Sequence, residues 1–319
     1  MAMTSAAPAV VVIGSVNMDL VVRAPHVPAP GETVLGSDFR TIPGGKGANQ
    51  AVAAARLGAD CRFVARVGDD PFGQTLLTGM KAIGINCNHV NVTEGVASGV
   101  ALIVVDELGE NAITVASGAN YRLSIEDIEA AKPLIASAKV CLLQLEIPLE
   151  TASYAIRLAK SLGVEVILDC APAPDPATMP RTLFDADILT PNETEAQILT
   201  GEPVAGKREA KILAAALAEH GARQVVLKLG EKGSLIFDGH HFEHVPPFKV
   251  KPIDTTAAGD AFSAALAVSR AKGMSLSESA LYANAAGAVA CLKFGAQPAM
   301  PTPDEIRTLM MRSGNEPAA

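Results

Sequence analysis

Asp260 stands between a run of small residues and an apolar stretch with helical character. The small residues occupy positions 255–259, and the apolar stretch covers 261–271. Turns built of Ala and Gly let backbone N–H groups converge, and a helix start adds unpaired donors and the positive end of its dipole. Such a turn suits a phosphoryl group. A carboxylate beside bound phosphate is costly unless it has a task, and accepting the proton of an attacking hydroxyl is such a task. The alternative is a structural Asp at a helix start, where this residue is favoured.

A second candidate segment has the sequence GGKGANQ at 44–50 and precedes a helical stretch over 51–57. Its glycines would let a ligand approach the backbone closely, while Lys46 and Asn49 add polar side chains. The segment is not a Walker A loop, because Gly47 follows the lysine where Ser or Thr is required. No G-x-G-x-x-G follows a strand, which argues against a dinucleotide-binding fold. An ordinary helix entry with a solvated lysine is the alternative.

Polar residues follow several predicted strands. Asn17 and Asp19 come after the β-branched run at 9–14. Four later apolar runs end in Glu146, Asp169, Asn192 and Lys228. Ligands of open α/β sheets bind beyond the carboxyl ends of the strands. Any one of these residues could be a turn or solvated loop residue, but together they indicate a site.

The elements that must position these residues alternate regularly after residue 122. We expect strands over 140–145, 164–168, 187–189 and 224–229. We expect helices over 124–138, 149–161, 193–200, 205–220, 258–272, 276–291 and 302–312. This alternation predicts right-handed crossovers and a parallel sheet, and therefore an α/β fold.

Two other segments predict a small separate β-sheet that could cover the site. Prolines interrupt residues 17–43, where β-like pieces such as 32–36 leave no room for a helix. Residues 97–116 contain a hairpin signal, with apolar runs at 99–105 and 111–115 around a turn. Because the first of these runs is apolar on both faces, we expect this lid to be covered by a second copy in a homodimer.

Composition narrows the class of protein. The 319 residues fit one domain over 1–319, with 49% hydrophobic and only 4% aromatic residues. A net charge of −8 argues against nucleic-acid and anionic membrane partners. The five cysteines are scattered and never spaced C-x-x-C, which argues against disulfides and a zinc site and favours a reducing compartment. The first apolar run is too short for a signal or membrane helix, so we expect a cytoplasmic protein.

Taken together, these motifs resemble the ribokinase-like (PfkB-type) carbohydrate kinases. Residues 254–262 resemble the C-terminal signature of the family, and 44–50 with VGDD at 67–70 resemble the N-terminal one. The string NETE at 192–195 is similar to the family's Asn-x-x-Glu motif. The resemblance covers about residues 10–306. It implies a three-layer αβα fold with a mostly parallel central sheet and a small β-sheet lid.

The resemblance also implies an activity and a set of site residues. The expected reaction is ATP-dependent phosphorylation of the primary hydroxyl of a sugar, D-ribose, with Mg²⁺ and K⁺ as cofactors. Asp260 would be the general base, kept ionised by the helix dipole. The anion hole would be formed by the backbone N–H groups of Ala257, Ala258 and Gly259. The sugar would contact Asn17, Asp19, Gly45, Lys46, Asn49, Glu146 and Asp260. The nucleotide would contact Asn192, Glu195, Lys228, Leu229, Gly230, Glu231, Lys232, Gly233, Gly259 and Asn284. The potassium ion would be bound by oxygens at Asp254, Thr256, Ala290, Lys293, Gly295 and Ala299.

Two positions depart from the family pattern. Members usually carry Asn-Pro where this chain has Asp169-Cys170, which places a carboxylate near the phosphates. Ala299 stands where relatives commonly offer a Ser hydroxyl to the cation.

Two alternatives to the expected activity remain open. One is a sister kinase acting on 2-deoxyribose, another sugar or a nucleoside, and the other is a sugar or nucleotide sensor without catalysis.

Overall fold

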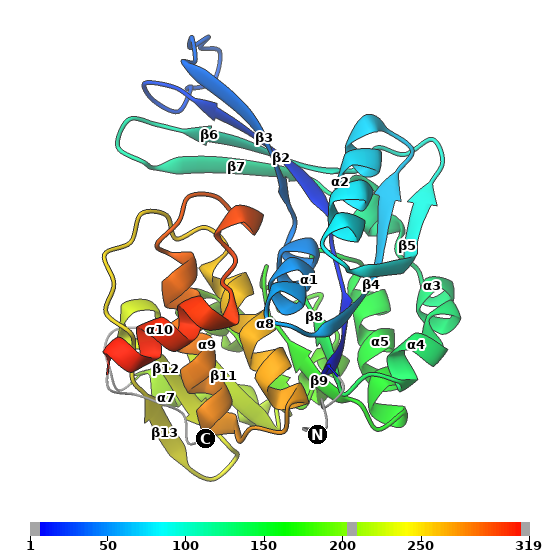
Figure 1. Cartoon of the computed structure of the whole chain (residues 1–319), viewed down its shortest axis with the longest axis vertical. Coiled ribbons are helices and arrows are strands. Elements are labelled where there is room, and N and C mark those ends of the chain that lie inside the picture. The colour runs from blue at the N-terminus through cyan, green and yellow to red at the C-terminus, as the bar shows by residue number, and fades with distance from the viewer. Residues whose placement is uncertain (1–6, 203–208, 314–319) are drawn as a thin grey trace, which may run out of the picture.

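A mostly parallel sheet forms the centre of the molecule. The computed structural model describes residues 7–202 and 209–313. Within them, the sheet has nine strands in the order β13-β12-β11-β10-β9-β8-β1-β4-β5 (Figure 1). The bounds are β1 Ala9–Ile13, β4 Asp60–Gly68, β5 Asn86–Thr93, β8 Val140–Leu143, β9 Glu165–Leu168, β10 Ile188–Leu189, β11 Gln224–Lys228, β12 Ser234–Phe237 and β13 Phe242–Val245. Neighbouring strands pair in parallel along the series β11-β10-β9-β8-β1-β4-β5. At the other end of the sheet, β12 and β13 are added by antiparallel pairing.

Helices cover both faces of this sheet. On β1, Val10 and Val12 pack into one core, whereas Val11 and Ile13 pack into the other, as the alternation of strand side chains requires. The first core is covered by α1 Lys46–Arg56, α2 Pro71–Ala82, α8 Ala258–Ala271, α9 Leu276–Ala290 and α10 Pro303–Arg312. The second is covered by α3 Ile125–Ala130, α4 Lys132–Ala136, α5 Leu149–Ser161, α6 Glu193–Thr200 and α7 Glu209–Glu219. The predicted α/β class with three layers is confirmed.

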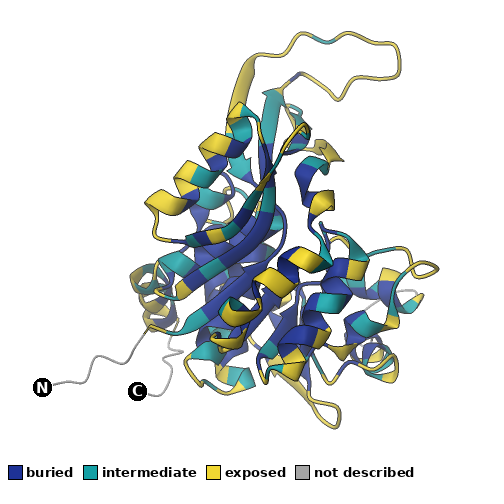
Figure 2. Cartoon of the chain, turned by 90° about the vertical axis from the view of Figure 1, so that its right-hand side faces the viewer, coloured by how far each residue is buried: buried dark blue, intermediate teal, exposed yellow. Residues whose placement is uncertain are grey.

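A second, smaller sheet stands above the carboxyl ends of the central strands (Figure 1). It contains β2 Asn17–Arg23, β3 Asp38–Gly44, β6 Gly99–Val105 and β7 Asn111–Ala116, in the order β3-β2-β6-β7. We call these strands the lid. The predicted hairpin is present as β6 and β7. The β-piece predicted over 32–36 is wrong: this segment is part of the exposed connection between β2 and β3 and has no strand (Figure 2).

Other differences from the sequence-based expectations have local causes. The single helix predicted over 124–138 is divided into α3 and α4, because Pro133 in the first turn of α4 cannot donate the hydrogen bond that would continue α3. Strand β4 was not predicted, since Arg62 and Arg66 interrupt its apolar pattern. The helix predicted over 205–220 is described from Glu209 onward, and its beginning lies outside the described residues. Among the helices of the described ranges, none has the length and apolar character needed to cross a membrane.

Candidate active site

The carboxyl ends of the parallel strands lie beneath the lid (Figure 1). Polar residues follow several of these strand ends. Asn17 lies beyond β1, Glu146 beyond β8 and Asp169 directly after β9. Lys228 ends β11, where its backbone N–H donates to the Pro191 carbonyl at 2.9 Å. The predicted edge of polar residues is therefore present.

The start of α8 faces this edge with Asp260 in its first turn. Ala257 precedes the helix in the left-handed conformation, with φ 58° and ψ 13°, and is the only non-glycine with positive φ among the described residues. A side chain in this conformation costs about 1–3 kcal/mol, a strain that concentrates at functional sites. The Ala258 N–H donates to the Thr255 carbonyl at 3.2 Å, within the turn itself. The turn and the helix dipole together suit an anion.

Asp260 is held by two amide side chains of α1. Asn49 Nδ2 donates to one carboxylate oxygen at 2.9 Å, and Gln50 Nε2 donates to the other at 3.1 Å. Burial, opposed by the charge of Lys46 and reinforced by that of Asp169, raises the pKa of Asp260 to about 6. At pH 7 and above the carboxylate is mostly ionised and can accept a proton.

Asp19 and Asn17 lie on the first lid strand, facing the same space. Burial, together with the charges of Glu146 and Asp260, raises the pKa of Asp19 to about 7. The Oδ1 atom of Asn17 accepts from Asn120 Nδ2 at 2.7 Å, which leaves its own Nδ2 to donate. Asn49 adds a buried Oδ1 that has no hydrogen-bond partner among the described residues. These groups supply the donors and acceptors that bind hydroxyls.

The beginning of α1 completes this side of the site. Glu146 accepts from Ser15 Oγ at 2.5 Å and from the Lys46 backbone N–H at 3.1 Å. Gly45 has φ 86°, and a Cβ placed there would lie 2.6 Å from the Asn17 backbone nitrogen, so only glycine fits. Although burial opposes it, the negative charges around Lys46, foremost that of Asp260, hold the pKa of its ammonium above the usual value.

The opposite side of the site contains a second lysine among carboxylates. Lys228 Nζ lies 2.7 Å from Asp169 Oδ1. At the start of α6, Asn192 and Glu195 form a capping box, in which each side chain accepts from the backbone N–H of the other. Burial and the charge of Asp169, against the attraction of Lys228, raise the pKa of Glu195. A phosphate chain next to the Ala257 turn would pass these groups.

The predicted nucleotide-contacting loop and Asn284 meet at the end of β13. The loop contains Leu229 and the 3-10 turn Gly230–Lys232, and Leu229 N–H donates to the Gly233 carbonyl at 2.8 Å. A Cβ on Gly233 would lie 2.3 Å from the Val245 carbonyl oxygen. Asn284 Nδ2 donates to the same carbonyl, at 3.3 Å. Glu231 and Lys232 are exposed on the loop.

The residues expected around potassium come from two loops that Asp254 joins. Its carboxylate accepts from the backbone N–H groups of Thr256 and Gly295, both at 2.9 Å. Ala290 ends α9, and Lys293 pairs with Glu305 at 2.6 Å, so this lysine can offer only its carbonyl. Ala299, which follows Gly295 closely in the sequence, is buried. The carboxylate and carbonyl oxygens available here are hard ligands.

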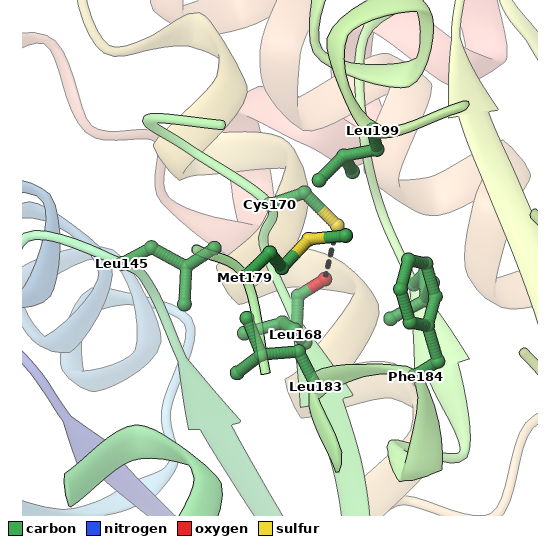
Figure 3. Close-up of a pocket in the computed structure, with 8 residues that line it drawn as sticks. Leu145, Leu168, Cys170, Met179, Leu183, Phe184 and Leu199 are labelled. Atoms are coloured by element: carbon green, nitrogen blue, oxygen red, sulfur yellow. Dashed lines mark hydrogen bonds between the residues drawn. The ribbon is translucent and has the colours of Figure 1, made fainter. Parts of the chain in front are cut away.

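Cys170 follows Asp169, but its thiol points away from the site. Sγ donates a weak hydrogen bond to the Leu168 carbonyl at 3.7 Å and faces a cavity of about 10 Å³ (Figure 3). The cavity is lined by Leu145, Leu168, Met179, Leu183, Phe184, Leu189 and Leu199. Burial raises the pKa of Cys170 well above its usual value. Of the two unusual residues, only Asp169 bears on the site.

Known proteins similar to this chain identify its family. The sequence profile described as pfkB family carbohydrate kinase matches residues 7–303. The chain belongs to the pfkB family of carbohydrate kinases. It is 41% identical to ribokinase of Bacillus subtilis over 299 residues, 94% of this chain and 98% of that protein. It is 40% identical to deoxyribokinase of Salmonella typhi over 253 residues, 79% of this chain and 82% of that protein. The structure of Arabidopsis thaliana ribokinase complexed with ribose and ATP superimposes with a TM-score of 0.87 at 34% identity, covering 96% of this chain and 99% of that chain.

Sequence reasoning did not assign roles to four residues that organise the site of this kinase. Gln50 links Asp260 to Asp169, since its Nε2 also donates to Asp169 Oδ2 at 2.8 Å. Gln144 Nε2 fixes the Gln50 amide by donating to Oε1 at 2.5 Å. Their positions within the GGKGANQ string and two residues before Glu146 were available signals. Asn120 and Ser263 gave none, because they enter the site only through tertiary packing.

Proposed function

We propose that this kinase transfers the γ-phosphoryl group of ATP to the primary hydroxyl of D-ribose and releases D-ribose 5-phosphate and ADP. The observation that carries the proposal is the Asp260 carboxylate, held by Asn49 and Gln50 at the start of α8, beside the strained Ala257 turn. A proton acceptor thus adjoins an anion site. The similarity to the Bacillus and Arabidopsis ribokinases over nearly the whole chain supports the sugar and the nucleotide.

The reaction needs little covalent work from the protein. The sugar oxygen attacks the γ-phosphorus, the bond to the β–γ bridging oxygen breaks, and Asp260 receives the hydroxyl proton. The helix dipole and the N–H groups of Ala257 and Gly259 would stabilise the negative charge on the equatorial oxygens, whereas the N–H of Ala258, also expected there, donates within the turn. Asp260 contributes a general base, which is typically worth about 10²–10⁴-fold in rate.

The groups on the lid side position the sugar. Asn17 can donate to a hydroxyl, whereas Asp19 and the unpartnered Oδ1 of Asn49 can accept. The lid covers this space, which excludes water and keeps ATP from being hydrolysed instead.

Magnesium fits the phosphate side. Mg²⁺ is usually held by one or two carboxylates, several waters and the substrate phosphates. Glu195 is a half-buried carboxylate at the start of α6, close enough to Lys228 and Asp169 for their charges to act on its pKa. Each of its oxygens accepts one hydrogen bond from Asn192, which leaves further lone pairs. Glu195 would hold the ion through water, and the ion would neutralise the phosphates.

A potassium ion fits the two loops that Asp254 joins. The donor set would combine this carboxylate with hydroxyl or carbonyl oxygens of the neighbouring loop residues, which are ligands of the right kind. Because residues 254–256 continue directly into the Ala257 turn, a bound cation would hold that turn in its anion-binding shape. Ala299 contributes no side-chain oxygen, so we expect weak binding.

A homodimer through the lid fits the exposed apolar side chains on the small sheet. Phe39 and Leu102 are 62% and 53% exposed, and the strand register places both on the face of the lid opposite Asn17 and Asp19. Ile113, 55% exposed, lies on the other face. An exposed apolar patch of this kind marks an interaction surface. A second copy of the lid would cover it.

The proposed function is tested by a coupled assay that measures ADP release with each sugar of a panel. A site built to hydrogen-bond a hydroxyl disfavours a ligand without it. We therefore expect kcat/KM for 2-deoxyribose to be lower than for ribose by at least about tenfold. Asp19→Ala should lower the ribose value and narrow this gap.

The similarity to the Salmonella deoxyribokinase makes 2-deoxyribose the second candidate substrate. Equal or better turnover of 2-deoxyribose by the wild type would replace the assignment with this sister activity. Ligand binding without turnover of any sugar would indicate a sensor.

A further inference from the structure

The buried pair of Asp169 and Lys228 has a geometry that a purely structural ion pair does not require. The two side chains are 2% and 13% exposed, and their charged atoms are 2.7 Å apart. A buried pair is weak evidence for stability, since removing two charges from water costs about as much as their attraction returns. Its position at the phosphate side of the site calls for a different explanation.

The ammonium of Lys228 lies against the anion-binding turn. A Cβ added to Gly259, in the first turn of α8, would lie 3.7 Å from Lys228 Nζ. The lysine backbone is fixed at this place by the end of β11, which pairs with Pro191 and Asn192. The lysine therefore projects its charge from β11 across to the point where a phosphoryl group would meet α8.

The carboxylate of Asp169 has more hydrogen-bond partners than the ammonium of Lys228. Asp169 accepts from Lys228 on Oδ1 and from Gln50 and Ser263 on Oδ2, at 2.8 and 3.1 Å. An ammonium has three donors, yet Lys228 Nζ has one acceptor among the described residues. With one donor used by Asp169, the ammonium has two donors left for a further anionic ligand at the anion-binding turn.

We propose that Lys228, anchored by Asp169, donates a hydrogen bond to the γ-phosphoryl group of ATP at the start of α8. This role rests on the proposed kinase function and deepens it, because it gives Lys228, expected only as one of several nucleotide contacts, a specific partner and Asp169 the role of anchoring it. Asp169 fixes the ammonium and is neutralised by it, so that its carboxylate does not repel the phosphates. Through Gln50, which donates to both Asp169 and Asp260, the lysine and the base are held in one network.

The test compares two nucleotides that differ by the γ-phosphoryl group. Calorimetry measures the affinities for ADP and for a non-hydrolysable ATP analogue, both with Mg²⁺, in wild type and in Lys228→Met. A charge-assisted hydrogen bond contributes roughly ten- to a hundredfold in affinity. We expect the analogue to lose at least about tenfold while ADP changes by less than about threefold. Equal losses for both nucleotides, or no loss, would overturn the proposal.

A double variant separates a contact between Lys228 and the phosphoryl group from mere neutralisation of Asp169. Asp169→Asn/Lys228→Met removes both charges, so it also serves if the single variant does not fold. We expect it to show the same selective loss of the analogue. Wild-type affinity for the analogue in the double variant would mean that Lys228 only neutralises Asp169, and would refute the contact.

The matched control is Lys160→Met, because Lys160 also pairs with an aspartate at 2.8 Å, but with Asp187 at the opposite end of the sheet. This variant should keep both affinities, and a selective loss of the analogue in it would count against the proposal. Since the measurement needs no turnover, it is independent of the sugar panel. A wild type that binds both nucleotides but phosphorylates no tested sugar would defeat the proposed function alone.

Discussion

The acid limb of the pH–rate profile follows from the charges around Asp260. A general base must be ionised, and kcat/KM reports the pKa values of the free enzyme. With a pKa of about 6 for Asp260, about nine tenths of the base is ionised at pH 7 and about a tenth at pH 5. The rate should therefore fall by about tenfold from pH 7 to pH 5 through this group alone, and remain level above pH 8.

Asp19 is a second carboxylate whose protonation should lower kcat/KM on the acid side of the profile. Its pKa is about 7, and the charge of Asp260 is one of the causes. Because the two carboxylates interact, the protons bind with apparent pKa values that belong to the pair. The wild-type limb should begin near pH 7 and become steeper near pH 6. In Asp19→Asn it should begin only near pH 6, since the upper group is gone.

The assay is kcat/KM for ribose from pH 5 to pH 9 by coupled ADP release, with the coupling enzymes in excess at each pH. Asp304→Asn, which changes an exposed carboxylate on α10, is the matched control and should keep the wild-type profile. A wild-type profile that stays level down to pH 5 would show that the pKa of the base is not raised, or that the base is another group. A limb that still begins near pH 7 in Asp19→Asn would remove Asp19 from the account.

Three other predictions follow from the same residues. Asp260→Asn should lower kcat by roughly 10²–10⁴-fold with nucleotide affinity in calorimetry nearly unchanged, and turnover like that of the wild type would place the base elsewhere. Activity should be higher in potassium than in sodium or Tris buffer, with a high half-activating concentration, and Asp254→Ala should abolish the difference; equal rates in the three salts would exclude the cation. Light scattering at micromolar concentration should give the mass of a dimer, and Leu102→Lys should give a monomer if the lid is the interface; a monomeric wild type would contradict the homodimer.

The parts of the fold that were predictable have regular local patterns. The β-branched run of β1 and the apolar stretch of α8 were predictable, because the spacing of their apolar residues along the sequence indicates a buried strand and a buried helix. Strand β4 did not, since Arg62 and Arg66 lie in it. Arg66 is tolerated in this strand because Asp127 of α3 binds its guanidinium at a distance of 2.6 Å. The two residues are 61 positions apart in the chain.

The candidate site was predictable in its positions and less so in its electrostatics. The helix dipole alone suggested an Asp260 that stays ionised. Burial and the nearby charge of Asp169 act in the opposite direction and raise its pKa, which depends on how closely α1, α8 and β9 pack. The link through Gln50 was also hidden, because it joins residues more than a hundred positions apart.

The charges of the site are organised around Asp169. Lys46 and Lys228 both experience its field, and in each case it is a cause of the raised lysine pKa. It also adds to the raised pKa of Asp260. A carboxylate in place of the neutral residue usual in the family therefore has opposite effects on its neighbours. It favours the charged forms of both lysines, while it favours the protonated form of Asp260, the proposed base. Lys46, Asn49 and Gln50 favour the ionised form of Asp260 against burial and Asp169, and so keep the proposed base available at neutral pH.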